Sequence, residues 1–160
     1  MGDAHGAQAV GQTVEWYTPS ALFDRLGLTF DLDPASSGAD MVPWIPAATH
    51  LTPDEDGLSR TWYGRVWLNP PYGRLMAPFL DRLKAHGHGI ALVYARTETG
   101  WWQRIAPRAD VVCFLRERLH FIRSDGYQAR SQMGSALLAF GEDCATAVVR
   151  ANLGWIVTKP

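Results

Sequence analysis

The stretch Val66-Trp67-Leu68-Asn69-Pro70-Pro71-Tyr72-Gly73 joins an apolar strand to a turn that carries hydrogen-bond acceptors and an aromatic ring. The two prolines stiffen the backbone and remove two N–H donors, so that carbonyl groups point outward. The amide oxygen of Asn69 and the carbonyl of Pro70 can then accept both hydrogens of an amino group, and Tyr72 offers a flat face to a planar base. Because ligands of open α/β folds bind at the carboxyl ends of strands, we interpret this turn as a binding site; the alternative is a plain strand-ending turn.

Strands and helices are predicted to alternate around this turn. The apolar pattern predicts strands over residues 29–32, 65–68, 90–94, 111–115 and 155–157, and helices over 75–86, 101–105 and 143–152. Continuous apolar runs such as residues 90–94 are typical of strands buried in a parallel sheet. The alternation therefore favours an α/β fold with a mostly parallel sheet. A late antiparallel strand pair is expected between residues 120–122 and 136–140, joined by the polar stretch 123–134.

The first part of the chain is predicted to hold one short helix and a long irregular region. Thr18 and Pro19 are interpreted as the N-cap and the first residue of a helix, and Gly27 as its C-terminal stop. Prolines and glycines interrupt residues 35–63, which have no long periodic segment. A loop of this length in a compact domain usually binds something or moves.

A length of 160 residues allows one domain with a single core. We expect a flexible leader over residues 1–13 and a single domain, without a separate target-recognition domain, over residues 14–160. No apolar run approaches the roughly 20 residues of a membrane helix, so no membrane partner is predicted. The two cysteines, Cys113 and Cys144, fit a reducing cytoplasm. The histidines lack metal-ligand spacing, so no metal site is predicted.

The formal charge of −1 conceals two halves of opposite charge. Residues 1–60 carry nine acidic side chains against two arginines, a net −7, and residues 61–160 carry thirteen basic against seven acidic ones, a net +6. A polyanion would therefore contact the second half of the chain. Charges that only solvate the surface would give the same pattern.

Several segments together resemble the phage-type DNA N-6-adenine methyltransferase family, a small Dam-like group that uses S-adenosylmethionine. The resemblance covers most of the chain, through residues 15–19, 31–35, 56–58, 69–73, 95–99, 101–102, 116–121 and 134–141. It implies a Rossmann-like S-adenosylmethionine-dependent methyltransferase fold and a site-specific, adenine-specific DNA methyltransferase. The implied setting is a bacteriophage or its bacterial host, within restriction-modification. The partners are DNA and S-adenosylmethionine, with the chain a monomer or weak homodimer.

The resemblance also implies roles for particular residues. The catalytic turn that holds the flipped base consists of Asn69, Pro70, Pro71 and Tyr72. The cofactor-binding residues are Tyr17, Thr18, Pro19, Asp31, Asp33, Pro34, Ala35, Asp56 and Asn69. The glycine-rich turn usual in such enzymes is replaced by residues 33–38, and the ribose-binding acid stays open between Asp40, Asp54 and Glu55.

The polar stretch 123–134 is predicted to contact DNA, with Tyr127 or Gln128 filling the gap left by a flipped base. The predicted DNA-binding residues are Arg96, Arg118, Arg123, Tyr127, Gln128 and Arg130. A flexible, solvated hairpin is the alternative for this stretch. The alternatives for function are methylation of cytosine, RNA or a protein glutamine, and a non-catalytic module that binds cofactor or DNA.

Overall fold

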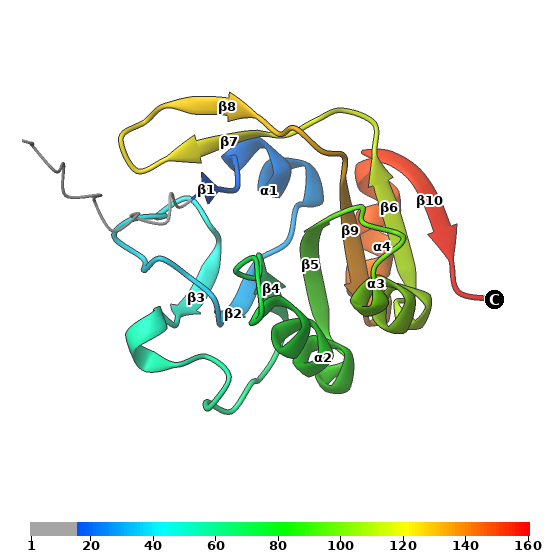
Figure 1. The fold of residues 1–160 in the computed structure, drawn as a ribbon, viewed down its shortest axis with the longest axis horizontal. Coiled ribbons are helices and arrows are strands. Elements are labelled where there is room, and N and C mark those ends of the chain that lie inside the picture. The colour runs from blue at the N-terminus through cyan, green and yellow to red at the C-terminus, as the bar shows by residue number, and fades with distance from the viewer. Residues whose placement is uncertain (1–15) are drawn as a thin grey trace, which may run out of the picture.

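The computed structural model describes residues 16–160, which form two β-sheets with helices packed against the larger one (Figure 1). The predicted leader, residues 1–13, lies outside the described residues. The strands are β1 (Trp16–Tyr17), β2 (Phe30–Asp33), β3 (Ala47–His50), β4 (Val66–Leu68), β5 (Gly89–Tyr94), β6 (Val111–Leu115), β7 (His120–Arg123), β8 (Gln128–Arg130), β9 (Ser135–Phe140) and β10 (Gly154–Thr158). The helices are α1 (Ser20–Leu26), α2 (Met76–His86), α3 (Gly100–Ile105) and α4 (Glu142–Ala151), with 3₁₀ turns η1 (Pro53–Glu55) and η2 (Ala106–Arg108).

The larger sheet has the strand order β10-β6-β9-β5-β4-β2-β3, and the prediction that it is a mostly parallel, Rossmann-like sheet is wrong. Strands β3, β2, β4 and β5 are parallel neighbours. Strand β9 is antiparallel to both β5 and β6, and β10 is antiparallel to β6. A parallel neighbour requires a long crossover, usually a helix, and the chain between β6 and β9 contains a hairpin instead. Because all six residues of β9 are buried, its sequence has the same apolar run as a parallel strand.

The predicted late antiparallel pair is also wrong in its partners. Strand β7 pairs with β8, with Ile122 opposite Gln128, so the polar stretch expected to be only a link supplies the second strand. Gly126 allows the tight turn of this hairpin because its φ of 82° lies in the left-handed region. Strand β1 pairs with the other edge of β7 and completes the smaller sheet, β1-β7-β8.

Hydrophobic cores lie on both faces of the larger sheet. One face packs against α1 and α4, and the other packs against α2 and α3; Figure 1 shows α2 and α3 on the viewer's side and α4 behind the sheet. In β4, Trp67 packs against Phe23 of α1 with 4.7 Å between ring centroids, while Val66 and Leu68 face α2. Burial on both faces therefore fixes the strand that carries the Asn-Pro-Pro-Tyr turn.

The first helix ends as predicted but begins differently. Gly27 adopts φ 62° and its N–H bonds to the carbonyl of Phe23, which confirms it as the C-terminal stop. Thr18 does not cap the helix: Pro19 is the extended residue before Ser20, and no side chain caps the first turn. The region 35–63 contains β3, whose short and weakly apolar sequence gave no periodic signal.

Candidate functional site

The carboxyl ends of the four parallel strands meet at one edge of the larger sheet. A cavity of about 550 Å³ lies at this edge. Its walls are the segments that follow β2, β3 and β4, the end of β5, and residues of the smaller sheet. Strand order places the segments after β2 and β3 at one end of the cavity, Tyr94 of β5 at the other, and the turn after β4 between them.

All four residues of the predicted catalytic turn line this cavity. They are Asn69, Pro70, Pro71 and Tyr72. The side-chain amide of Asn69 donates a 3.5 Å hydrogen bond to the hydroxyl of Thr18, which turns the amide nitrogen toward β1. Pro70 is buried, whereas Tyr72 is 51% exposed. The turn therefore presents acceptors and a partly open ring to the same space.

Thr18 contributes to the site by positioning Asn69. Its side chain is fully buried, and its carbonyl accepts a 2.7 Å hydrogen bond from the indole nitrogen of Trp44. These contacts fix the segment between β1 and α1 against the catalytic turn. The sequence pattern suggested a helix cap at Thr18 and the resemblance implied a cofactor contact there, but neither gave a signal for the contact with Asn69.

Replacing Thr18 by valine is expected to lower kcat about twofold, because it removes one long hydrogen bond of 3.5 Å while keeping the shape of the side chain. Methyl transfer to DNA under saturating cofactor and DNA measures this effect. Thr18→Ser retains the hydroxyl and is the matched control. Equal activities for the valine and serine variants would contradict the positioning role.

Asp33 lies at the end of the cavity formed by the segments after β2 and β3. It is buried without a cationic partner among the described residues. It is 2% exposed, and burial raises its pKa to about 7 against the hydrogen bonds from the Ala35 N–H and from Ser36. The Nδ1 of His50 lies 3.7 Å from the Asp33 carboxylate, too far for a hydrogen bond, and bonds to the Ser36 hydroxyl at 2.8 Å. Burial lowers the pKa of His50, which favours the neutral imidazole beside this acid. A buried carboxylate in this environment is suited to a cationic ligand.

Most, but not all, of the predicted cofactor-binding residues line the cavity. Those that do are Tyr17, Thr18, Asp33, Pro34, Ala35, Asp56 and Asn69. Asp31 lies outside it, because alternate residues of β2 face opposite sides and its carboxylate accepts the Arg65 N–H at 2.7 Å. Pro19 also lies outside, at the start of α1.

The candidate ribose-binding acids do not line the cavity. Asp40, Asp54 and Glu55 are exposed and do not line it, and Glu55 caps its own 3₁₀ turn by accepting from the Thr52 N–H at 2.8 Å. Asp56, the next residue, does line the cavity. A Cβ at Gly57 would lie 1.8 Å from the Pro34 carbonyl, so glycine is required for the loops after β2 and β3 to meet here.

Tyr94 and Phe121 are among the residues that line the cavity without having been assigned to the site from the sequence. Tyr94, expected only as the end of a buried strand, stacks on Tyr72 with 4.6 Å between ring centroids and 19° between ring planes. Phe121 of β7 is buried and faces the same space. These two side chains reach the cavity because elements distant in the sequence pack together. Apolar periodicity within one segment does not indicate such packing.

The predicted DNA-binding residues lie outside the cavity, several of them on the β7–β8 hairpin. Gln128, Arg130 and Tyr127 are exposed, and the guanidinium of Arg123 lies 5.1 Å from the ring centroid of Tyr127. Some of these arginines already have partners: Arg123 pairs with Asp125, and Arg96 pairs with Glu98 at 2.6 Å. Arg118 reaches the carbonyl of Ser131 at 3.5 Å.

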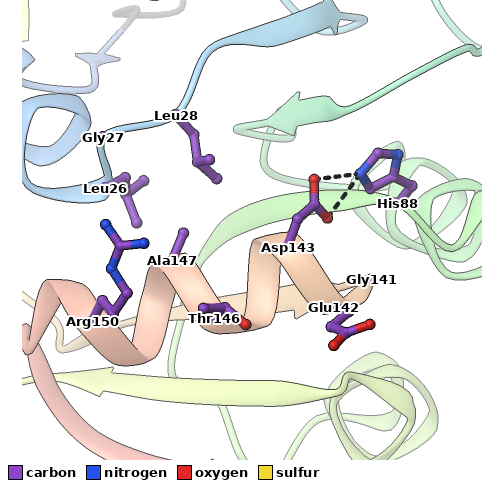
Figure 2. A pocket seen from close by; sticks show the side chains of 10 residues that line it. All are labelled: Leu26, Gly27, Leu28, His88, Gly141, Glu142, Asp143, Thr146, Ala147 and Arg150. Atoms are coloured by element: carbon purple, nitrogen blue, oxygen red, sulfur yellow. Dashed lines mark hydrogen bonds and ion pairs between the residues drawn. The ribbon is translucent and has the colours of Figure 1, made fainter.

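A second cavity, of about 720 Å³, lies at the opposite edge of the larger sheet and contains none of the predicted site residues. Figure 2 shows Asp143 of α4 directed at His88, and Nε2 of His88 lies 3.0 Å from both carboxylate oxygens. Ligand atoms of His88, Asp143 and Cys144 lie within 4.8 Å of one another, a spacing that suits a metal ion. However, Arg65 already bonds to Asp143 at 2.6 Å, and burial raises the pKa of the Cys144 thiol to about 12. This cluster is therefore interpreted as structural, linking α4 to the sheet.

Replacing Asp143 by asparagine is expected to lower the free energy of unfolding at pH 7 by about 1–2 kcal/mol, a modest value because the carboxylate is 40% exposed. Partial burial opposes ionisation, but hydrogen bonds from His88 and Arg65 hold the pKa of Asp143 well below its usual range. The stabilisation is therefore complete above the ordinary pKa of 3.8 and is lost as the pH falls toward the lowered pKa of the folded state.

Urea unfolding at several pH values measures this effect, with Glu142→Gln as the control because Glu142 is the exposed neighbouring acid. The difference between wild type and Asp143→Asn should shrink at acidic pH. A difference that does not change with pH would contradict the ion-pair explanation.

One cavity thus brings together the Asn69–Tyr72 turn and the buried carboxylate of Asp33. A family model, DNA N-6-adenine-methyltransferase (Dam), matches residues 8–146, and the chain belongs to this family. Searches of curated proteins and of solved structures give no significant match. Membership makes the chain a methyltransferase of adenine in DNA and implies S-adenosylmethionine as the methyl donor. Within residues 16–160, no helix has the length and apolar character needed to cross a membrane.

Proposed function

We propose that the chain methylates the exocyclic amine of a specific adenine, which it flips out of duplex DNA into the 550 Å³ cavity. The observation that carries this proposal is the common cavity of the Asn69–Tyr72 turn and the buried Asp33. The turn supplies acceptors for an amine, and Asp33 supplies an anionic contact for a cationic methyl donor. The two reactants are thus held beside each other at the sheet edge.

The catalytic turn makes the amine a better nucleophile. The lone pair of an adenine amine is delocalised into the ring, and hydrogen bonds from the amine to Asn69 and Pro70 favour a pyramidal nitrogen with a localised pair. Thr18 holds the Asn69 amide nitrogen, so the amide oxygen is directed to the substrate. Bound S-adenosylmethionine supplies an activated methyl group on a positively charged sulfur. Transfer would then be a direct in-line displacement, in which the N–C bond forms as the S–C bond breaks and the methylated amine afterwards loses one proton to water. Its barrier falls through positioning and preorganised electrostatics.

The residues present fit the implied cofactor. S-adenosylmethionine carries an ammonium and a sulfonium group, and Asp33 is a buried carboxylate for which the described residues provide no cation. Around it, Tyr17, Pro34, Ala35 and Asp56 line the cavity and complete the proposed binding surface. Pro19 and Asp31 lie outside that surface, so neither is retained as a cofactor contact.

DNA is proposed to lie across the smaller sheet. Phe121 links the hairpin to the cavity because it belongs to β7 and lines the cavity wall. Tyr127 and Gln128 at the hairpin can fill the space left by a flipped base, and Arg130 can contact phosphate. We also propose that Arg96, Arg118 and Arg123 contact phosphates. Arg96 and Arg123 now pair with Glu98 and Asp125, so DNA phosphates would compete with these carboxylates. One domain of this size leaves room for a short target sequence.

Incubation with isotopically labelled S-adenosylmethionine and unmethylated DNA, followed by nucleoside analysis, tests the proposal. Labelled N6-methyladenine is the expected product. Labelled N4-methylcytosine, label in RNA or protein only, or cofactor binding without transfer would each overturn it. The last of these outcomes would identify a non-catalytic binding module.

A further inference from the structure

The ring of Tyr94 lies against the ring of Tyr72, the residue proposed to stack on the target base. Their centroids are 4.6 Å apart and their planes differ by 19°, and both side chains line the cavity. The two residues come from neighbouring parallel strands, since Tyr94 ends β5 and Tyr72 belongs to the turn after β4. One face of Tyr72 is therefore covered by another aromatic ring.

The two rings differ in how firmly the fold holds them. Tyr94 is the last residue of β5, it is paired with the buried Ser135 of β9, and its side chain packs against the hydrophobic core. Tyr72 is 51% exposed and precedes Gly73, whose φ of 99° marks a tight turn. The contact with Tyr94 is thus the stacking contact that ties the Tyr72 ring to the sheet.

Given the proposed function, we infer that Tyr94 is a positioning residue that fixes the plane of the Tyr72 ring, so that the target base stacks on the other face of Tyr72. The stack then has three layers: Tyr94 held by the sheet, Tyr72, and the base. A base held in a fixed plane keeps its amine aligned with Asn69 and Pro70. Without Tyr94, Tyr72 can still contact a base, but the orientation of that base is no longer defined.

Tyr94→Leu and Tyr94→Phe test this inference, since leucine keeps most of the bulk and phenylalanine keeps the ring. In steady-state methylation of unmethylated plasmid DNA, Tyr94→Leu should lower kcat about tenfold, in line with the strength of aromatic pairs. Its affinity for S-adenosylmethionine should stay within about twofold of wild type, because Tyr94 lies at the opposite end of the cavity from Asp33. Tyr94→Phe should restore kcat to within about threefold of wild type.

A spectroscopic measurement separates positioning from a general loss of structure. Sequencing of DNA treated with the protein locates the methylated adenine, and 2-aminopurine then replaces that base in an oligonucleotide. Stacking quenches 2-aminopurine, so its emission in the complex with Tyr94→Leu should exceed that in the wild-type complex, while Tyr94→Phe matches wild type. If the wild-type protein methylates DNA and Tyr94→Leu changes neither kcat nor the 2-aminopurine emission, the inference about Tyr94 is overturned while the proposed function stands.

Three other outcomes also count against it. If Tyr94→Phe loses as much activity as Tyr94→Leu, the hydroxyl and not the ring is responsible. If Tyr94→Leu increases kcat/KM, the ring competes with the base for Tyr72. If wild-type protein transfers no methyl group to adenine, the proposed function fails first, and the role of Tyr94 fails with it.

Discussion

Asn69→Ala is expected to lower kcat for DNA methylation about 10²-fold or more, by analogy with the loss of one preorganised electrostatic contact in other active sites. The variant lacks the amide oxygen that accepts from the substrate amine, and only the Pro70 carbonyl remains. The affinity for S-adenosylmethionine should change much less than kcat, because the carboxylate of Asp33 is retained. Single-turnover methyl transfer with saturating DNA and cofactor measures the chemical step directly.

Asn69→Asp is the matched control because it retains an acceptor oxygen at the same position. The Thr18 hydroxyl can reverse its role and donate to the new carboxylate, so the side chain remains anchored. We therefore expect the aspartate variant to be much more active than the alanine variant. An alanine variant that keeps more than about a tenth of wild-type kcat would be inconsistent with the proposed role of Asn69.

The position of the Asn69–Tyr72 turn was predictable because its signal is local. An apolar triplet followed by Asn-Pro-Pro-Tyr indicates a buried strand that ends at a ligand edge, and the structure places all four residues of the turn on the cavity. Tyr94 was missed because its contact comes from another strand: it meets Tyr72 across the β4–β5 pair. Sequence spacing along one segment contains no record of such contacts.

Strand direction was not predictable in the same way. Both β5 and β9 have buried, nearly continuous apolar sequences, yet they run antiparallel to each other. Side-chain periodicity reports burial and not direction, and direction depends on whether a helix or a hairpin links two strands. The short stretch Gln128–Arg130 was not recognised as a strand because two of its three residues are exposed and its composition is polar. Because β8 pairs with β7, β7 does not form the pair with β9 that the sequence predicted.

Asp33→Asn is expected to weaken the binding of S-adenosylmethionine at pH 8 about 10²-fold, as is usual when one partner of a buried charge pair is truncated. The variant keeps the size of the side chain and loses only the negative charge that faces a cationic ligand. Isothermal titration with the cofactor measures the change. Asp24→Asn is the control, because Asp24 is an exposed acid on α1 outside the cavity, and it should bind like wild type. Unchanged binding by Asp33→Asn would exclude Asp33 as the cationic contact.

The pH dependence supplies a second, independent readout of the same carboxylate. Burial raises the pKa of Asp33 to about 7. Below pH 7 the Asp33 carboxyl of the free protein is therefore largely protonated, and binding of a cationic ligand must release this proton. Affinity for the cofactor should therefore fall about tenfold between pH 8 and pH 6 in wild type, and should be nearly independent of pH in Asp33→Asn.

The stability of the folded protein should change with pH in the opposite direction to the cofactor affinity. A carboxyl group whose pKa is raised on folding destabilises the folded state as the pH rises from 3.8 to about 7, so Asp33→Asn should melt at a higher temperature than wild type at pH 8. Weaker binding combined with a higher Tm cannot come from unfolding. A lower Tm with parallel loss of binding would instead show that Asp33 holds the fold and not the ligand.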